Sequence, residues 1–238
     1  MKPLRIAYLY PAEMNIYGDR GNVIVLEQRC RWRGIRTQID EIHLGQDYDF
    51  AKADIVFGGG GQDMGQELVA NDLMKRRRGL VAAAEDGLPM LLICGLYQLF
   101  GRRFVTAEGR ELPGIGLFGA ETVAGSTRMI GNIVTDTPFG RLVGFENHSG
   151  QTRLDETQAA LGTIVLGAGN DGTSGKEGAL RHNAIGTYLH GPILPKNPNL
   201  ADFLIETALR RRSPNCELRG LDDTLEHQAA DLAAKLNR

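Results

Sequence analysis

The sequence predicts an α/β protein with a doubly wound, mostly parallel sheet and helices on both of its faces. Over residues 4–100, short apolar runs of strand length alternate with segments of helical periodicity, and glycine follows several of the runs, as at Gly58–Gly61 and Gly95. This rhythm is typical of parallel strands joined by helical crossovers. With 238 residues, 42% of them hydrophobic and 24% charged, the chain is large enough to bury a sizeable core.

The expected elements follow one another along the chain. The first part gives strands at 4–10, 35–42, 54–57 and 88–93, and helices at 23–33, at 71–85 and from Gly95 onward. The second part gives strands at 131–135, at 144–150 before a turn, as short pieces among loops within 162–178, and at 184–190, then a helix at 199–209. We expect one domain over 1–212 and a tail over 213–238 that ends in an amphipathic helix, with its apolar face formed by Leu225, Ala229, Leu232 and Leu236.

The overall charge and the cysteines exclude several classes of protein. The formal net charge of −2 gives no general attraction to nucleic acid or to a membrane surface. The basic run 75–78 indicates a solvated helix face, with a docking patch for an acidic partner as the alternative. The three cysteines, Cys30, Cys94 and Cys216, form no CxxC pair, which argues against a disulfide framework and a zinc site and for a reducing compartment. No signal peptide or membrane-spanning run is found, so we expect a cytoplasmic protein that binds no metal.

Cys94 is the first candidate for chemistry. It directly follows the apolar run 88–93, and Gly95 then opens a helix-like stretch. A cysteine between a buried strand and a helix matches a nucleophile elbow, which lifts the thiol out of the sheet and places it at a helix N-terminus. A buried core cysteine is the alternative, since free cysteine is among the most buried residue types. We interpret Cys30 and Cys216 as structural.

A nucleophilic thiol needs a base, and two of the five histidines are candidates for this role. His190 ends an apolar strand and precedes Gly191 and Pro192, so it would extend over the carboxyl edge of the sheet, where doubly wound proteins place their sites. His148 lies in the polar stretch 146–150, which indicates a turn. We therefore favour His190 over His148.

The glycine run Gly58–Gly61 follows a predicted strand. A tight turn and a phosphate-binding loop are both possible uses of such a run, but no Gly-Lys-Ser/Thr sequence follows it, so it is not a P-loop. Glycine loops at strand ends also direct backbone N–H groups at an oxyanion. The amides of Gly60 and Gly61, together with that of Gly95, would form such a hole for the tetrahedral intermediate of acyl transfer.

Five segments together resemble a known family. They are Tyr17–Asn22, Phe57–Asp63, Ile93–Leu99, Gly144–His148 and Gly186–Pro192. On these motifs the chain is similar to the class I, triad-type glutamine amidotransferases of the cobyric-acid-synthase-like branch, whose domain is flavodoxin-like. Within the branch it most resembles the glutaminase subunits of lipid II isoglutaminyl synthases. The likeness extends from about residue 4 to residue 209.

The resemblance implies that the chain hydrolyses L-glutamine to glutamate and ammonia through a thioester on Cys94, with His190 as base and then as acid. It also implies that Arg128 binds the substrate, since a guanidinium holds a carboxylate with two hydrogen bonds. Gln98 would line the same pocket. Without the resemblance, Arg128 would pass for a surface arginine and Gln98 for a capping or packing residue.

The same resemblance implies a partner. The ammonia would pass to a MurT-like, ATP-dependent ligase in a heterodimer, and the ligase would amidate the D-glutamate of the lipid II stem peptide. The chain would thus serve peptidoglycan synthesis, and with it cell wall biogenesis and cell shape. ATP and magnesium would be needed only in the ligase, and this chain would hold no cofactor.

One position departs from the pattern of the family. Many triad amidotransferases carry an acid two residues after the catalytic histidine, where this chain has Pro192. The imidazole usually needs a third group to orient it. We expect this group to come from the partner ligase, or from a remote residue of this chain, Asp19 or Glu146.

Rival functions stay open at this point, among them a thiol hydrolase that does not act on glutamine. A cobyric-acid-type amidotransferase would act on another carboxylate acceptor, but its glutaminase is fused to a synthetase for which we expect no room in this chain. A non-catalytic binding module of the same fold is a further possibility. Such a module would be expected to lack the thiol or the histidine, and both are present here.

Overall fold

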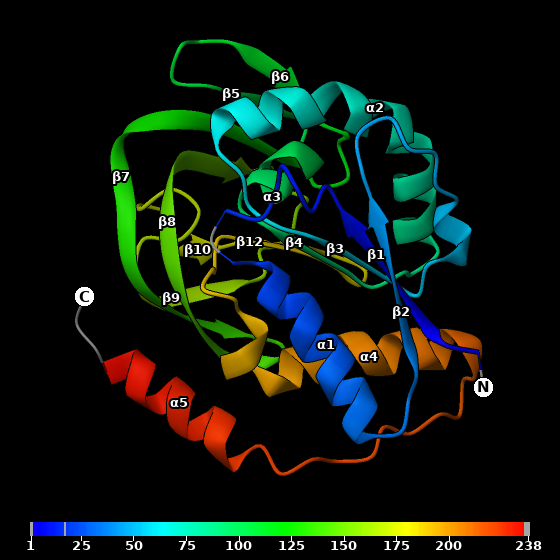
Figure 1. Ribbon diagram of the computed structural model, residues 1–238. Helices are drawn as coiled ribbons and strands as arrows, with labels where there is room; N and C mark the ends of the chain where they lie inside the picture. Colours follow the sequence, from blue (N-terminus) through cyan, green and yellow to red (C-terminus); the bar gives the residue numbers. More distant parts are fainter. Residues whose placement is uncertain (1, 17, 236–238) are drawn as a thin grey trace.

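The computed structural model describes residues 2–16 and 18–235 and contains two β-sheets (Figure 1). The first, called the central sheet below, has the strand order β11–β12–β4–β3–β1–β2. Its neighbours are parallel except for β11, which runs antiparallel to β12. The strands are β1 (Leu4–Leu9), β2 (Thr37–Ile42), β3 (Ile55–Gly58), β4 (Met90–Ile93), β11 (Ala179–Arg181) and β12 (Ala184–Thr187). The predicted doubly wound, mostly parallel sheet is confirmed.

Helices cover both faces of the central sheet, with α1 and α4 on one side and α2 and α3 on the other (Figure 1). Because of this cover, the inner strands β1, β3, β4 and β12 are buried almost throughout, as parallel strands between helical layers must be. The helices are α1 (Arg20–Trp32), α2 (Asp63–Glu85), α3 (Gly95–Phe100) and α4 (Pro198–Arg212), with short 3₁₀ turns η1 (Phe50–Lys52) and η2 (Leu194–Lys196). Among the described residues, no helix is long and apolar enough to cross a membrane.

The second sheet is mostly antiparallel, and the sequence analysis did not predict its extent. Its order is β10–β9–β7–β5–β6, and β8 pairs with β7 along most of its length. The strands are β5 (Arg103–Val105), β6 (Glu111–Pro113), β7 (Ala120–Thr137), β8 (Gly140–Leu154), β9 (Gly162–Leu166) and β10 (Lys176–Glu177). The turn expected within 146–150 was wrong, because these residues lie inside β8 and alternate between the two faces of the sheet.

Two element boundaries also differ from the prediction. Helix α2 begins at Asp63 rather than at residue 71, and Gly65 lies within its first turn. A Cβ on Gly65 would come within 2.9 Å of the backbone oxygen of Glu13. Strand β12 ends at Thr187, and His190 instead forms a single antiparallel bridge to Phe145 of β8. This bridge joins the two sheets beside the pocket described below.

Two side chains of the basic run 75–78 bind other parts of the protein. The guanidinium of Arg76 binds Asp72 and the hydroxyl of Tyr10, at 2.8 and 3.0 Å. Arg77 donates to the carbonyl of Ile115 at 2.9 Å. Two of the four basic side chains therefore hold the helix to its surroundings rather than forming only a solvated face.

The tail forms the predicted helix, α5 (Thr224–Lys235), but its apolar face does not pack on the domain. Leu225 and Leu232 are 76% and 66% exposed, and Leu236 lies outside the described residues. The helix instead approaches the second sheet through its small residues, and Asn132 of β7 donates to the carbonyl of Ala233 at 3.2 Å.

A buried arginine clamps the tail to the domain. Arg29 of α1 is 2% exposed and makes two hydrogen bonds to Asp202 of α4, at 2.7 and 2.8 Å, and two to Asp223, at 2.6 and 3.0 Å. A planar guanidinium suits two carboxylates in this way because it presents several donors in a fixed geometry.

Replacing Arg29 with alanine is therefore expected to lower the free energy of unfolding by about 3–5 kcal/mol, since Asp223 loses its ion pair with Arg29 and Asp202 keeps only its ion pair with Arg33. Urea denaturation followed by circular dichroism measures this. Arg31→Ala, on the same helix but exposed, serves as the control and should change stability by less than about 0.5 kcal/mol. Equal stability of the two variants would show that the clamp contributes nothing.

Candidate active site

The turn at Cys94 has the backbone of a nucleophile elbow. Strand β4 ends at Ile93, Cys94 adopts φ +47° and ψ −101°, and α3 starts at Gly95. A positive φ is uncommon for a residue with a Cβ and persists only where its surroundings enforce it. Here the amide of Cys94 donates to Thr187 of β12 at 2.8 Å, and its carbonyl accepts from Gln98 at 2.9 Å. The side chain is 6% exposed and lines a pocket.

His190 comes to Cys94 from the far end of the chain. It is 1% exposed, and two backbone hydrogen bonds to Phe145, of 2.8 and 3.2 Å, hold it beside β8. Burial lowers the pKa of His190, but the Cys94 thiolate and the Asp19 carboxylate raise it by more, to about 10. The imidazole of His190 is therefore protonated at neutral pH and faces the sulfur of Cys94.

Asp19 lies on the other side of the imidazole. It is fully buried just before α1, and its Oδ1 is 3.6 Å from Nδ1 of His190. Its Oδ2 accepts a hydrogen bond of 2.7 Å from the amide of Gly60. Of the two remote acids that the sequence analysis considered, Asp19 is the one that faces the histidine.

Glu146, the other remote acid, serves a loop instead. Its two carboxylate oxygens accept from the amides of Ala168 and Gly169, at 2.7 and 2.9 Å. It is buried within β8, and burial raises its pKa in spite of these two hydrogen bonds. Its contacts hold the turn after β9 rather than the imidazole.

The glycine loop Gly58–Gly61 packs against the turn at Cys94, but only some of its amides are placed as the sequence predicted. The amide of Gly60 is engaged by Asp19, so Gly60 is corrected from an oxyanion donor to a spacer. A Cβ at this position would come within 2.8 Å of Cε1 of His190 and 3.2 Å of Cβ of Cys94, so only glycine fits without movement. Gly61 and Gly95 remain as donors, and they are adjacent, since a Cβ on Gly95 would lie 3.0 Å from the amide nitrogen of Gly61.

His148, the less favoured base, has a structural environment. Its ring stacks on Tyr188 with a centroid distance of 3.6 Å and an angle of 5°, and its Nδ1 contacts the carbonyl of Gly150 at 2.9 Å. Burial lowers its pKa to about 4, so the ring is neutral at physiological pH. The preference for His190 agrees with this geometry.

Gln98 lines the pocket, but its amide is already used. Its Oε1 accepts from Gln66 of α2 at 2.6 Å, and its Nε2 donates to the hydroxyl of Tyr188 at 3.0 Å. The Tyr188 hydroxyl continues to Thr152 at 2.6 Å. Gln98 is therefore better described as a brace of the pocket floor than as a direct ligand. Gln66, which carried no signal in the sequence, also contacts the carbonyl of Gly95 at 3.2 Å.

A second buried carboxyl, which the sequence analysis missed, holds the backbone just before His190. Glu177 of β10 is fully buried and accepts from the Thr187 hydroxyl at 2.6 Å and the Tyr188 amide at 2.7 Å. Burial raises its pKa to about 7. It ties the second sheet to the end of β12, directly before the histidine.

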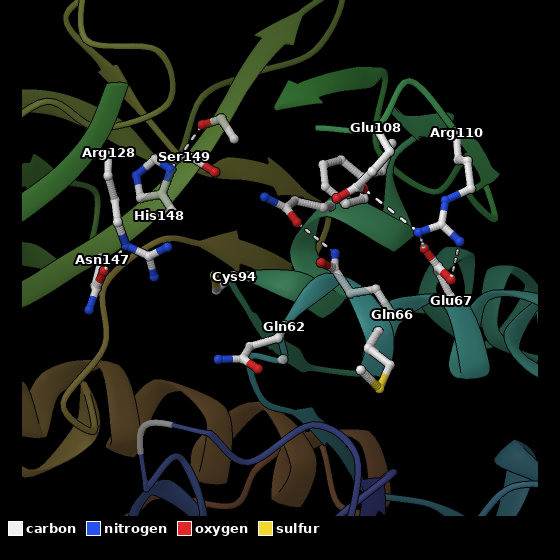
Figure 2. A pocket seen from close by; sticks show the side chains of 15 residues that line it. Gln62, Gln66, Glu67, Cys94, Glu108, Arg110, Arg128, Asn147, His148 and Ser149 are labelled. Atoms are coloured by element: carbon white, nitrogen blue, oxygen red, sulfur yellow. Dashed lines mark hydrogen bonds and ion pairs between the residues drawn. The ribbon is translucent and has the colours of Figure 1, made fainter. Parts of the chain in front are cut away.

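A cavity of about 560 Å³ opens beside the thiol, and its lining includes Cys94, Gln98 and His148 (Figure 2). Cys94 lies between two groups of charged side chains on opposite sides of the cavity. Arg128 of β7 stands on one side, where its Nε donates to Asn147 at 2.6 Å. On the other side, Arg110 binds Glu67 through two contacts of 2.8 and 2.7 Å. Arg128 thus lies at the pocket, as expected for a group that takes a substrate carboxylate.

No cluster of three or more histidine, cysteine or acidic side chains suited to a metal ion occurs within the described residues. The chemistry that the site offers is that of a thiol, an imidazole and two adjacent backbone amides. Together these groups can attack a carbonyl carbon, stabilise the resulting oxyanion and protonate a leaving amine.

Comparison with known proteins is consistent with this chemistry. Residues 5–198 match the model of the CobB/CobQ-like glutamine amidotransferase domain. The chain is 41% identical over 230 residues to the lipid II isoglutaminyl synthase (glutamine-hydrolyzing) subunit GatD of Staphylococcus aureus, covering 96% of this chain and 94% of that protein. It is 37% identical to the GatD subunit of Streptococcus pneumoniae, over 96% and 89% of the two chains.

More distant proteins share the fold. A cobyric acid synthase of Listeria monocytogenes is 28% identical over 85% of this chain, but only 41% of that protein is covered. Among solved structures, PurLQS from Thermotoga maritima superposes with a TM-score of 0.59 at 15% identity, covering 90% of this chain and all of that one. A glutamine amidotransferase from Thermotoga maritima gives 0.55 at 14% identity, over 98% and 94%.

Proposed function

The chain belongs to the CobB/CobQ-like glutamine amidotransferases, and from that membership we propose that it is the glutaminase subunit of a lipid II isoglutaminyl synthase. The single observation that carries the proposal is the Cys94–His190 pair at the elbow, because a thiol beside an imidazole is the arrangement that cysteine acyl transfer requires.

The proposed reaction begins with attack of the Cys94 thiolate on the amide carbon of glutamine. The oxyanion of the tetrahedral intermediate accepts hydrogen bonds from the amides of Gly61 and Gly95. The His190 imidazolium then protonates the amide nitrogen, the C–N bond breaks, and ammonia leaves a thioester on Cys94.

Hydrolysis of the thioester completes the cycle. His190, now neutral, removes a proton from a water molecule as it attacks the thioester carbon. The second oxyanion uses the same two amides, the C–S bond breaks, and glutamate leaves. The thiolate and the imidazolium are then restored, and the sum is glutamine plus water to glutamate plus ammonia.

The ammonia acceptor and the partner are part of the same proposal. The relatives that match over almost their whole lengths are named GatD subunits, whereas the cobyric acid synthase matches over less than half of its length. We therefore assign the ammonia to a MurT-like ligase, which uses ATP and magnesium to amidate the D-glutamate carboxyl of lipid II. Two exposed apolar side chains of α2, Met64 and Leu68, at 77% and 59% exposure, support a protein partner near the pocket.

Two measurements test the proposed function. A glutamine analogue that carries a diazoketone in place of the amide should alkylate Cys94, with the adduct located by mass spectrometry. Glutamine labelled with ¹⁵N in its amide should transfer the label to lipid II in the presence of the ligase subunit and ATP. Absence of the adduct would reject the glutaminase; an adduct without transfer would reject the acceptor alone.

Arg128 is expected to bind the α-carboxylate of glutamine, releasing its contact with Asn147. Arg128→Ala should raise KM about 30- to 100-fold and change kcat less, because charge-assisted hydrogen bonds to a carboxylate are worth about 2–3 kcal/mol. Steady-state glutaminase kinetics measure this. Arg141→Ala is the control, since Arg141 is an exposed arginine of β8 paired with Asp136. An unchanged KM in Arg128→Ala would remove this residue from the substrate site.

A further inference from the structure

One carboxylate oxygen of Glu177 holds the chain where it leaves β12. Its Oε1 accepts from the hydroxyl of Thr187 at 2.6 Å and from the amide of Tyr188 at 2.7 Å. The same hydroxyl accepts from the amide of Leu189 at 3.1 Å. Because a threonine hydroxyl has one proton to donate, its bond to Glu177 leaves its lone pairs free to face Leu189. The carboxylate therefore sets the path of the chain from the strand to His190.

The segment that Glu177 holds also supports the nucleophile. The carbonyl of Thr187 accepts from the amide of Cys94 at 2.8 Å, and Cys94 has a φ of +47°. A positive φ in a residue with a Cβ persists only where its surroundings enforce it. Thr187 is thus bonded to Glu177 through its hydroxyl and to the elbow through its carbonyl. Three residues later the same segment presents His190, so one carboxylate fixes the thiol and the imidazole relative to each other.

The carboxyl of Glu177 is not needed to fill space. It has no solvent exposure, and burial raises its pKa to about 7, an effect that outweighs the hydrogen bonds from Thr187 and Tyr188, which lower it. The charged form is therefore less stable in the folded chain than in water. An apolar side chain of similar size would avoid this desolvation. Such a side chain could not accept the two hydrogen bonds, so what the carboxyl supplies is the geometry of the segment.

We propose that Glu177 is a positioning residue of the glutaminase reaction, which holds the Cys94 thiol and the His190 imidazole in place through Thr187 and Tyr188. In this role Glu177 transfers no proton and acts through the backbone of residues 187–190. The inference rests on the proposed function and goes beyond it, since it gives β10 of the second sheet a part in the chemistry. Loss of this support should lower kcat and leave KM nearly unchanged.

Thr187→Val is the first test, because it removes the hydroxyl that donates to Glu177 but keeps the shape of the side chain and the carbonyl that binds Cys94. Its kcat for glutamine should fall about 10- to 100-fold with KM within about 3-fold, since an error of about 1 Å in placing a reacting atom costs about 10²-fold in rate. Thr187→Ser restores the hydroxyl and should return kcat to within about 3-fold of the wild type. Steady-state glutaminase kinetics in the presence of the ligase subunit measure these values.

Thr135→Val is the matched control. It makes the same change at a fully buried threonine of β7, whose hydroxyl has no hydrogen-bond partner among the described residues. Its kcat should stay within about 2-fold of the wild type. Urea denaturation of every variant gives the folded fraction, so that each kcat refers to folded protein.

Glu177→Met is a second variant that removes the acceptor itself and fills the same space with an apolar side chain. Its kcat should fall about 10²-fold, again with little change in KM. It keeps the inference testable if Thr187→Val does not fold. A wild-type kcat in both Thr187→Val and Glu177→Met would overturn the inference. A raised KM at unchanged kcat would do the same, as would a Thr187→Ser variant as slow as Thr187→Val.

The proposed function is judged separately, by glutamine turnover of the wild type. If the wild type does not hydrolyse glutamine, alkylation of Cys94 by iodoacetamide still tests the role of Glu177, because an imidazolium beside a thiol increases its reactivity. The rate at neutral pH, with the adduct located by mass spectrometry, should be about 5-fold lower in Thr187→Val than in Thr135→Val. Equal rates in these two variants would reject the positioning role.

Discussion

Replacing Cys94 with alanine is expected to lower kcat for glutamine hydrolysis at least about 10⁴-fold, because no other group can form the acyl-enzyme. The fold should persist, since the change removes one sulfur atom from a side chain that is 6% exposed and leaves the elbow backbone intact. Glutamate formation from glutamine, with and without the ligase subunit, is the measurement.

Cys216→Ala provides the control for this loss. Cys216 is partly exposed in the tail and lies outside the pocket, so its removal should leave kcat within about 2-fold of the wild type. Residual turnover by Cys94→Ala above the level of a mock preparation would contradict the thioester mechanism, whereas equal loss in both cysteine variants would indicate damage to the fold.

Replacing His190 with glutamine is expected to lower kcat about 10³-fold or more, since both proton transfers depend on its ring. Arg128, the proposed ligand of the substrate carboxylate, is unchanged in this variant, so KM should change little. The rate of Cys94 alkylation should fall at neutral pH and rise only at alkaline pH, as it does for a thiol without an imidazolium.

His182→Gln is a suitable control, because His182 is an exposed histidine that contacts Glu85 far from the thiol. The double variant Cys94→Ala with His190→Gln should be no slower than Cys94→Ala alone, because the two groups act as one unit. Losses that add in the double variant would mean that His190 acts outside the thiol chemistry.

The sequence predicted much of the central sheet because its inner strands are short and buried, and two of them, β3 and β4, lead into glycine. Strands β1, β3 and β4 read as apolar runs, and the helices between them show clear periods. The second sheet was mostly missed. Its long strands β7 and β8 contain many polar residues and glycines, since one face is partly open to solvent, and such strands are hard to tell from loops.

The candidate site could be predicted only in part. Cys94 and His190 each follow a buried strand, so rules of topology bring them to the same edge of the sheet. The side chains that support them come from other layers. Asp19 lies in a loop rich in turn formers, and Gln66 and Glu177 stand in stretches with no motif. Asp19 was a candidate only as one of two remote acids, and nothing in local periodicity shows that Gln66 and Glu177 are buried beside the site, so the three-dimensional contacts identify those two.

The bridge between His190 and Phe145 places the pocket on the seam between two sheets. The nucleophile belongs to the central sheet, while Arg128 belongs to β7 of the second sheet. Under the proposed function, glutamine bound through its α-carboxylate to Arg128 and through its amide carbon to Cys94 would span both sheets. Asparagine is one methylene shorter, and an error of about 1 Å in placing a reacting atom costs about 10²-fold in rate. We therefore expect the spacing of the two sheets to select amino acid amides by chain length.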